Sequence, residues 1–390
     1  MKTERLYYNR TYLREFDATV VSVKEGDGTH WWTELDRSAF YPTSGGQPFD
    51  TGRIGEAFVS NVEVDKNGTV FHYTDRCFVP GDRVKGTIDW DRRFDHMQQH
   101  AGEHMLAGAI WEKVHGTTIG LHLGDTVSSI DVTMPDGRTH LSREEITQIE
   151  KLVNSRIQHD DAIRCWFPAD DELAALPLRK EPTVKENIRI VQIGEYETVA
   201  CGGTHPSTTG QIGSIYITDV SPARGKIRFS FVCGARAAKL YRKTGDAADE
   251  ACRLLSSSIE TLPKEISRIL EHQEKILREL RAAQTRLLCV RLANAETVYT
   301  GDFRLYAVYE PGFDYDAASD AVSEWIRSQG RIVLFSNGKR LIYAASDDVN
   351  ADMAALMKKT ARGGGRKDFA TGAGGMDEIR KAKDELAGTK

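Results

Sequence analysis

The chain has 390 residues, a length that corresponds to two or three domains with hydrophobic cores of their own. Hydrophobic residues make up 40%, and no run approaches the roughly 18 consecutive apolar residues of a membrane helix, so we expect no membrane partner. The net charge of −5, from 52 basic and 57 acidic residues, excludes a surface that is positive throughout. A nucleic-acid partner would therefore require a local basic patch. No secretory signal follows Met1, and the six cysteines are widely spaced, so we expect a cytoplasmic protein with reduced thiols.

Residues 8–90 are rich in predicted strands. Short apolar or alternating runs are separated by Gly, Asp and Pro, which is the pattern of strands joined by tight turns. Such a segment is predicted to form a small barrel or a sandwich. The predicted strands are Ala18–Val23, Ala57–Val64, Thr69–Tyr73 and Arg83–Ile88.

The pattern changes to helix at Trp90, where apolar residues recur every three to four positions until Val114, just before Gly116. A second helix is expected to begin at Ser142, which has capping-box spacing to Glu145. Strand-like runs lie between and after these helices, so residues 91–240 are predicted to form one α+β domain. The runs are Thr126–Val132, Ala162–Phe167, Asn187–Ile193, Ser214–Thr218 and Lys226–Val232.

Residues 259–290 have apolar side chains at spacings of three and four, which favours a coiled coil. We place the helix start at Pro263, because proline suits the first turn of a helix. Left in water, these apolar side chains would form a large exposed stripe, so we predict a homodimer through residues 263–290. The alternative is a long helix packed along its own domain.

Residues 301–390 are predicted to form a compact α/β module with a glycine loop and a last helix. The predicted strands are Arg304–Tyr309, Arg331–Ser336 and Arg340–Ser346, and the predicted helices before the loop are Ala317–Ser328 and Ala351–Thr360.

Two short segments contain residues suited to metal binding. His100 and His104 are four residues apart on the first predicted helix, so their imidazoles project from one face, and His96 continues the stripe. Such a pair is also typical of a solvated polar stripe. Cys201 and His205 are bridged by a glycine turn that lets both side chains point inward. Together, His100, His104, Cys201 and His205 supply nitrogen and sulfur donors, which suit one Zn²⁺ per chain better than Mg²⁺ or Ca²⁺.

Four protein ligands would leave the metal no position for an activated water, so it would shape the pocket or hold substrate. A competing interpretation is a zinc metallopeptidase, because His100-x-x-Glu103-His104 fits the inverted zinc-peptidase pattern with Glu103 as general base. That interpretation leaves Cys201 and His205 unexplained.

These segments resemble a known family. His100–Leu106, followed by Cys201–His205 and Thr209–Gly213, is similar to the editing domain of alanyl-tRNA synthetase and to the free-standing AlaX editing proteins. Residues 40–52 resemble the glycine-rich motif of the family's N-terminal barrel. Residues 363–372 resemble the glycine loop of the domain that follows the editing domain in the synthetase, so the long AlaX form is the nearest match.

The resemblance implies an α+β multidomain fold. Its parts would be an N-terminal β-barrel domain (1–90), a zinc-binding editing domain (91–240), a helical or coiled-coil linker (241–300) and a C-terminal, DHH-associated tRNA-binding domain (301–390). It also implies hydrolysis, in trans and without ATP, of the ester in tRNA(Ala) mischarged with serine or glycine. Ser44 stands where many AlaX proteins have a third glycine, and Lys367 where the synthetases usually have proline.

A pocket that hydrogen-bonds the serine hydroxyl would leave polar groups unpaired with alanine, which would spare the correct product. The candidate catalytic residues are Glu103 and Gln47, and the candidate substrate-binding residues are Thr43, Ser44, Gly45, Gly46 and Thr204. The alternative interpretation of residues 43–47 is a turn that only shapes the barrel, and the alternative for Glu103 is a solvated helix residue without a catalytic role.

For tRNA binding we expect a patch of cations and glycines near the C-terminus, since glycines let backbone amides approach phosphates. Its members are Lys358, Lys359, Arg362, Gly363, Gly364, Gly365, Arg366 and Lys367. The alternative for the patch is a solvated charge run. The alternative for the whole chain is a non-catalytic tRNA-binding protein with structural zinc.

Overall fold

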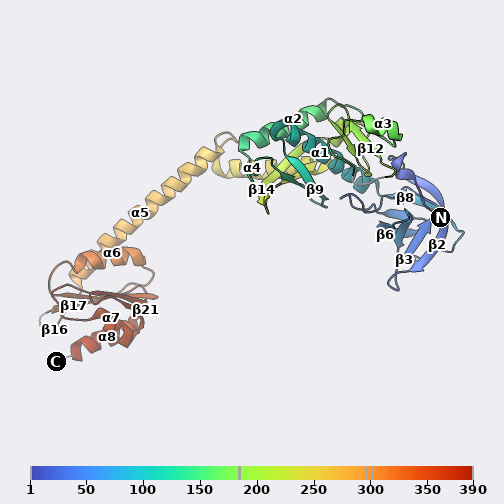
Figure 1. Ribbon diagram of the computed structural model, residues 1–390. Coiled ribbons are helices and arrows are strands. Elements are labelled where there is room, and N and C mark those ends of the chain that lie inside the picture. The colour runs from blue at the N-terminus through green and yellow to red at the C-terminus, as the bar shows by residue number, and fades with distance from the viewer. Residues whose placement is uncertain (1, 183–185, 296, 301–302, 389–390) are drawn as a thin grey trace. The chain divides into compact units, whose positions relative to one another are not determined.

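The computed structural model describes residues 2–182, 186–295, 297–300 and 303–388. The chain divides into two units, Met1–Ala247 and Ala248–Lys390, and is a mixed α/β protein (Figure 1). Among the described residues, no helix is long and apolar enough to cross a membrane.

The first unit begins with a closed barrel, which confirms the barrel predicted for this segment. Neighbouring strands are antiparallel, and their alternate side chains fill the interior with residues such as Val20, Leu35 and Val62. In barrel order the strands are β2 (Glu15–Glu25), β3 (Trp31–Leu35), β7 (Val70–Thr74), β6 (Ala57–Val64), β5 (Gly52–Ile54) and β8 (Arg83–Ile88). Before the barrel, β1 (Glu4–Arg5) pairs with β4 (Arg37–Ser38), and a 3-10 turn, η1 (Leu6–Tyr8), follows β1.

Helix α1 (Trp90–Val114) is the central element of the remaining part of this unit. Its bounds are those predicted, and His115, in the left-handed region at φ 53°, ends it. Every residue from His96 to Ile110 is buried, so polar side chains on this helix face protein rather than water. The alternative interpretation of His100 and His104 as a solvated polar stripe is therefore wrong.

Helix α2 (Arg143–Gln158) packs on α1, and its capping box joins Ser142 and Glu145 as predicted. Two antiparallel sheets complete the core around these helices. One sheet contains β14 (Ile215–Ala223), β15 (Lys226–Cys233), β10 (Ser128–Thr133) and β9 (Thr117–Leu123). The other contains β11 (Ile163–Trp166), β12 (Ile190–Ile193) and β13 (Glu197–Ala200), with the short helix α3 (Asp170–Ala175) after β11 and the 3-10 turn η2 (Thr209–Ile212) after β13.

Two long helices follow the sheets. Helix α4 (Gly234–Leu255) starts directly after β15, so helix begins seven positions before residue 241, where the predicted linker starts. Helix α5 (Leu262–Asn294) has Pro263 in its first turn, as expected. Its apolar positions Ile269, Ile276 and Leu280 are 42–51% exposed, whereas Leu288 and Leu292 are buried against the second unit's own core. Packing along its own domain therefore covers only the C-terminal end of α5.

The second unit is a six-stranded sheet with helices on both faces. Helices α5 and α6 (Tyr315–Trp325) cover one face, and α7 (Met353–Thr360) and α8 (Met376–Gly388) cover the other, because alternate strand residues enter two separate cores. In sheet order the strands are β16 (Val298–Thr300), β17 (Phe303–Tyr309), β18 (Arg331–Ser336), β19 (Arg340–Ala345), β21 (Phe369–Ala373) and β20 (Arg362–Gly365).

The predicted glycine loop is wrong, because residues 362–365 form the edge strand β20, paired with β21. A side chain at Gly363 would overlap the backbone of Thr371 and Gly372 and would reach Met357 of α7. Glycine at this position therefore permits close packing of the hairpin against α7. Gly364 has open space around its Cα.

Candidate metal centre

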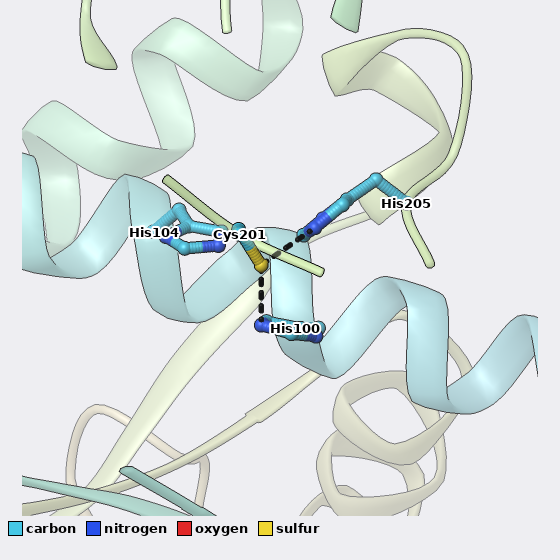
Figure 2. Close-up of side chains that lie close together, drawn as sticks. All are labelled: His100, His104, Cys201 and His205. Atoms are coloured by element: carbon cyan, nitrogen blue, oxygen red, sulfur yellow. Dashed lines mark hydrogen bonds between the residues drawn. The ribbon is translucent and has the colours of Figure 1, made fainter. Parts of the chain in front are cut away.

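Four side chains from two segments, α1 and the turn at 201–205, converge at one face of α1. His100 and His104 come from one face of α1, Cys201 follows β13, and His205 lies beyond the turn (Figure 2). The Cys201 Sγ atom is 3.4 Å from Nε2 of His100 and 3.4 Å from Nε2 of His205. All four donor atoms lie within 4.8 Å of one another, so the group can hold one metal ion. His96 is not part of this group.

The turn between Cys201 and His205 is held by a buried arginine that the sequence reasoning missed. Arg189 Nη1 donates hydrogen bonds to the carbonyl oxygens of Cys201 (3.1 Å) and Gly203 (2.8 Å). The Cys201 N–H in turn donates to the Arg189 carbonyl at 2.9 Å. The one sequence signal for this role is a cation placed directly before the apolar strand β12.

Gly203 permits the close approach of this turn to α1. A Cβ at Gly203 would overlap the imidazole of His100 and lie 3.0 Å from Oε1 of Gln47. At Gly202, the nearest atom to such a Cβ is the Tyr8 hydroxyl, 3.9 Å away. Only the second glycine of the pair is therefore required by packing.

Gln47 lies behind His100 and is completely buried. Its Oε1 accepts hydrogen bonds from His100 Nδ1 at 2.9 Å and from the Thr204 N–H at 3.0 Å, while its Nε2 donates to Thr204 Oγ1 at 2.8 Å. With Nδ1 occupied, the free nitrogen of His100 is Nε2, which faces Cys201. Gln47 and Thr204 thus orient a candidate ligand and do not line the large cavity described below.

The loop that supplies Gln47 is attached to both the barrel and α1. Ser44 and Gln47 exchange backbone hydrogen bonds of 3.0 and 3.1 Å across Gly45 and Gly46, whose φ angles of 58° and 84° are those of a tight two-residue turn. Asp50 accepts from the Tyr41 N–H at 2.6 Å and forms a fully buried ion pair with Arg93. Because Arg93 is on α1, two turns before His100, this ion pair ties the loop to the helix that bears both histidines.

The donor set fits a metal on three observations. Neither ring nitrogen of His104 has a hydrogen-bond partner although both are buried, and Nε2 of His205 faces the Cys201 sulfur. One oxygen of Glu103 is 3.4 Å from Nδ1 of His104, without the geometry of a hydrogen bond. A tetrahedral zinc site, with Zn–N of ~2.0 Å and Zn–S of ~2.3 Å, separates its sulfur and nitrogen donors by about 3.5 Å, close to the spacing found here.

Burial keeps these groups uncharged in the absence of a cation. It lowers the pKa of His100 to about 3 and lowers the pKa of His104 and His205 well below the usual range. Neutral imidazole is the form that binds metals. Burial also raises the pKa of the Cys201 thiol to about 12, and a bound cation is what would favour the thiolate.

A cavity of about 970 Å³ opens onto the cluster. His100, His104 and Cys201 form part of its wall, and of the predicted substrate-binding residues Ser44 and Gly45 also line it. Tyr41, which the sequence reasoning missed, lines the cavity too and donates a hydrogen bond to the Ser44 carbonyl at 3.1 Å. Thr43, Gly46 and Thr204 are not among the lining residues, and Thr43 is exposed to solvent.

Glu103 is buried, not solvated, and lines a different cavity of about 240 Å³ on the other side of His104. Burial raises the pKa of its carboxyl group to about 7, and the nearby Arg179 opposes this shift. Arg179 itself pairs with Glu197 at 2.8 Å. Glu103 thus lies next to His104 without a hydrogen bond between them.

Comparison with known proteins places the chain in a family. Residues 188–230, which include Cys201 and His205, match the family described as the threonyl and alanyl tRNA synthetase second additional domain. The alanyl-tRNA editing protein AlaX-L of Pyrococcus horikoshii is 30% identical over 95% of this chain and 94% of that protein. The chain belongs to the AlaX family of alanyl-tRNA editing proteins.

Alanine–tRNA ligases are also similar to this AlaX-family chain. The ligase of Pyrococcus abyssi is 31% identical over 99% of this chain, and the ligase of Pyrococcus furiosus is 32% identical over 100% of this chain. The chain spans 43% of each of these ligases. Their similarity covers both units of the AlaX-family chain and so is not limited to the residues around the cluster.

The basic patch of the second unit is partly neutralised. Lys359 pairs with Glu385, and Arg366 pairs with Asp368 at 3.2 Å. Within the described ranges, Lys358 and Arg362 are exposed cations that form no ion pair. Lys367 is also exposed and donates to the Asn350 side chain at 3.3 Å.

Proposed function

We propose that this protein hydrolyses, in trans and in the cytoplasm, the aminoacyl ester of tRNA(Ala) mischarged with serine and, less efficiently, with glycine. The observation that supports this most directly is the cluster of His100, His104, Cys201 and His205 on the wall of a large cavity, in a chain that aligns with AlaX-L over nearly its full length. A cavity of about 970 Å³ has room for a ligand of the size of an aminoacyl nucleoside.

The metal is proposed to be one Zn²⁺ per chain, held by those four residues. Two imidazoles from one helix face, a third imidazole and a thiolate are the donors that zinc prefers over harder cations. When bound, zinc would supply a positive charge beside the reacting ester. Gln47 and Glu103 are both proposed to act by positioning ligands, Gln47 through its hydrogen bond to His100 and Glu103 through its 3.4 Å contact with Nδ1 of His104.

Ser44 is the proposed determinant of amino-acid choice. It lines the cavity, its carbonyl is held by Tyr41, and among the described residues its hydroxyl has no hydrogen-bond partner. A hydroxyl with a free hydrogen-bonding site can pair with the serine hydroxyl of the substrate, which alanine lacks. The ester itself is reactive, so a water oriented in the cavity suffices for much of the rate.

The second unit is proposed to add affinity for the body of the tRNA. Lys358 and Arg362 are its candidate phosphate contacts, because neither is engaged by an acidic side chain within the described ranges. Replacing Lys358 by alanine should raise KM for aminoacyl-tRNA and reduce the salt slope of binding by about one. Lys339→Ala, also an exposed lysine of this unit, is the matched control.

The deciding experiment measures release of labelled serine from Ser-tRNA(Ala) beside Ala-tRNA(Ala), with a peptide panel as a third substrate class. We expect rapid release of serine, slow release of alanine and no peptide cleavage. Cleavage of peptides that is lost in Glu103→Gln would establish the metallopeptidase alternative. Tight tRNA binding without release of either amino acid would establish a non-catalytic tRNA-binding protein.

A further inference from the structure

Three cationic side chains lie at one end of the large cavity, where the N-terminal segment forms its wall. Lys2, Arg5 and Lys66 all line the same cavity as the histidine cluster. A Cβ built on Gly68 would lie 2.5 Å from Nη2 of Arg5 and 2.9 Å from Cε of Lys2, so both side chains extend over this glycine. Gly68 and Lys66 belong to the same β6–β7 turn. Two chain segments more than 60 residues apart thus place their positive charges together.

These charges are available to a ligand. Within the described ranges, none of Lys2, Arg5 and Lys66 forms an ion pair. Arg5 donates one hydrogen bond, from Nη1 to the Tyr8 hydroxyl at 3.2 Å, and its buried Nε has no hydrogen-bond partner. The neighbouring Asp65 accepts from the backbone N–H groups of Asn67 and Thr69 at 2.9 and 2.8 Å, so its carboxylate is engaged by its own turn.

The acidic side chains that line this cavity do not cancel the cations. Glu4 pairs with Arg37 at 3.4 Å, on β4. Glu186 is the other acidic lining residue, whereas Arg189 adds a fourth cation to the wall. The cavity therefore has an excess of positive charge in a protein whose net charge is −5.

Two aromatic rings lie beside the cations. Tyr8 and Phe167 pack edge to face with their ring centroids 5.5 Å apart, and both line the cavity. Phe167 is 43% exposed although it is large and apolar, so it presents unburied aromatic surface. Cations next to exposed aromatic rings are the combination that binds single-stranded nucleic acid, through phosphates and stacked bases.

We propose that this part of the cavity binds the single-stranded 3′ end of the aminoacylated tRNA, with Lys2, Arg5 and Lys66 contacting phosphodiester groups and Phe167 stacking on a base. The proposal rests on the proposed function, because the same cavity places the candidate metal ligands where the ester would lie. A substrate that reaches the cations and the cluster together must have a reactive acyl group at one end and phosphates upstream. An aminoacylated 3′ end has this order of groups.

The first test measures binding of a labelled single-stranded RNA tetranucleotide with the sequence of the 3′ end of tRNA(Ala), by fluorescence anisotropy at several salt concentrations. The double variant Lys2→Ala/Lys66→Ala replaces two exposed side chains and should reduce the slope of log K against log salt by about 1.4, at ~0.7 per phosphate contact. The control Lys151→Ala/Lys243→Ala removes the same charge from exposed sites outside the cavity and should keep the wild-type slope. Phe167→Ala should weaken binding about tenfold at an unchanged slope.

The second test separates this site from the proposed function. Hydrolysis of a seryl ester of adenosine, which has no phosphodiester, should be equal in the wild type and in Lys2→Ala/Lys66→Ala, whereas KM for Ser-tRNA(Ala) should rise in the variant. A wild-type salt slope in this variant, or an equal loss in the control, overturns the site even if Ser-tRNA(Ala) is hydrolysed. If the tetranucleotide binds as expected but no substrate is deacylated, the proposed function fails and the binding site stands.

Discussion

Gln47 accepts a hydrogen bond from Nδ1 of His100 at 2.9 Å, although the two residues are 53 positions apart and belong to the barrel and to α1. The same oxygen accepts from the Thr204 N–H, beside the second pair of candidate ligands. One buried amide therefore connects the glycine-rich turn, the histidine helix and the cysteine turn. Removing this amide should therefore lower metal affinity more than it lowers the stability of the fold.

We expect Gln47→Ala to lower zinc affinity roughly 10–100-fold, because His100 would lose the partner that holds its ring and its tautomer. Gln47→Glu should retain most of the affinity, since a carboxylate accepts the same two hydrogen bonds. Competition with a chromogenic chelator measures both variants, and Gln148→Ala on the exposed face of α2 is the control. Equal affinities in wild type and Gln47→Ala would exclude the positioning role.

The two adjacent glycines of the cysteine turn should differ sharply. Gly203→Ala should displace His100 or the turn and reduce both zinc content and stability, by about 1–3 kcal/mol, because the new methyl group overlaps the imidazole. Gly202→Ala has open space and should be close to wild type. Elemental analysis and thermal unfolding of the two purified variants test this difference, which would be refuted by similar zinc contents.

Ser44→Ala should reduce kcat/KM for Ser-tRNA(Ala) roughly tenfold, the equivalent of one hydrogen bond of about 1.4 kcal/mol. The rate with Ala-tRNA(Ala) should change little, so the preference for serine should narrow. Thr43→Ala, one residue earlier and outside the cavity, should leave both rates unchanged. Deacylation of the two substrates under single-turnover conditions measures the preference, and an unchanged ratio in Ser44→Ala would remove Ser44 from amino-acid selection.

His72 should make the protein less stable in mild acid. It is completely buried in the barrel, between Ser38 and the Thr33 carbonyl, and burial lowers its pKa from 6.5 to about 4. As pH falls below 6.5, the unfolded chain takes up a proton at this site that the folded chain does not, so the free energy of unfolding decreases until pH reaches about 4. The contribution of His72 is about 3 kcal/mol over this range.

Urea unfolding of wild type and His72→Gln between pH 4 and pH 7 isolates this contribution from that of the other histidines. The variant should have a smaller decrease in unfolding free energy over the range, while exposed His140→Gln should follow the wild type. An identical pH dependence for wild type and His72→Gln would contradict the assignment.

The exposed stripe of α5 should pair with a second copy of the chain. Ile269, Ile276 and Leu280 recur at coiled-coil spacing and are 42–51% exposed within one chain. Light scattering should give a mass near twice 43.5 kDa, and Leu280→Asp should shift it toward a single chain. Ser267→Asp adds the same charge off the stripe and should stay dimeric. A mass near 43.5 kDa for the wild type at all concentrations would disprove the pairing.

Local patterns in the sequence were sufficient for the limits of α1, the capping box of α2, four of the six barrel strands and the four residues that the structure brings together, whereas β3 and β5 were not predicted. Helical spacing alone puts His100 and His104 on one face, and a two-glycine turn alone lets Cys201 and His205 converge. These features depend on residues within a few positions of each other. They are therefore visible in the order of amino acids.

Only the tertiary structure decided what surrounds those residues. Gln47 and Arg189 support the cluster through contacts with other segments of the chain, and Glu103 lies in a separate cavity because His104 stands between the two. On α5, Leu288 is buried while Leu287 is exposed, because only Leu288 lies on the side of the helix that packs against the second unit's core. Tertiary packing decides which side that is. Such contacts form between segments that are distant in sequence, so spacing along the chain contains no direct signal for them.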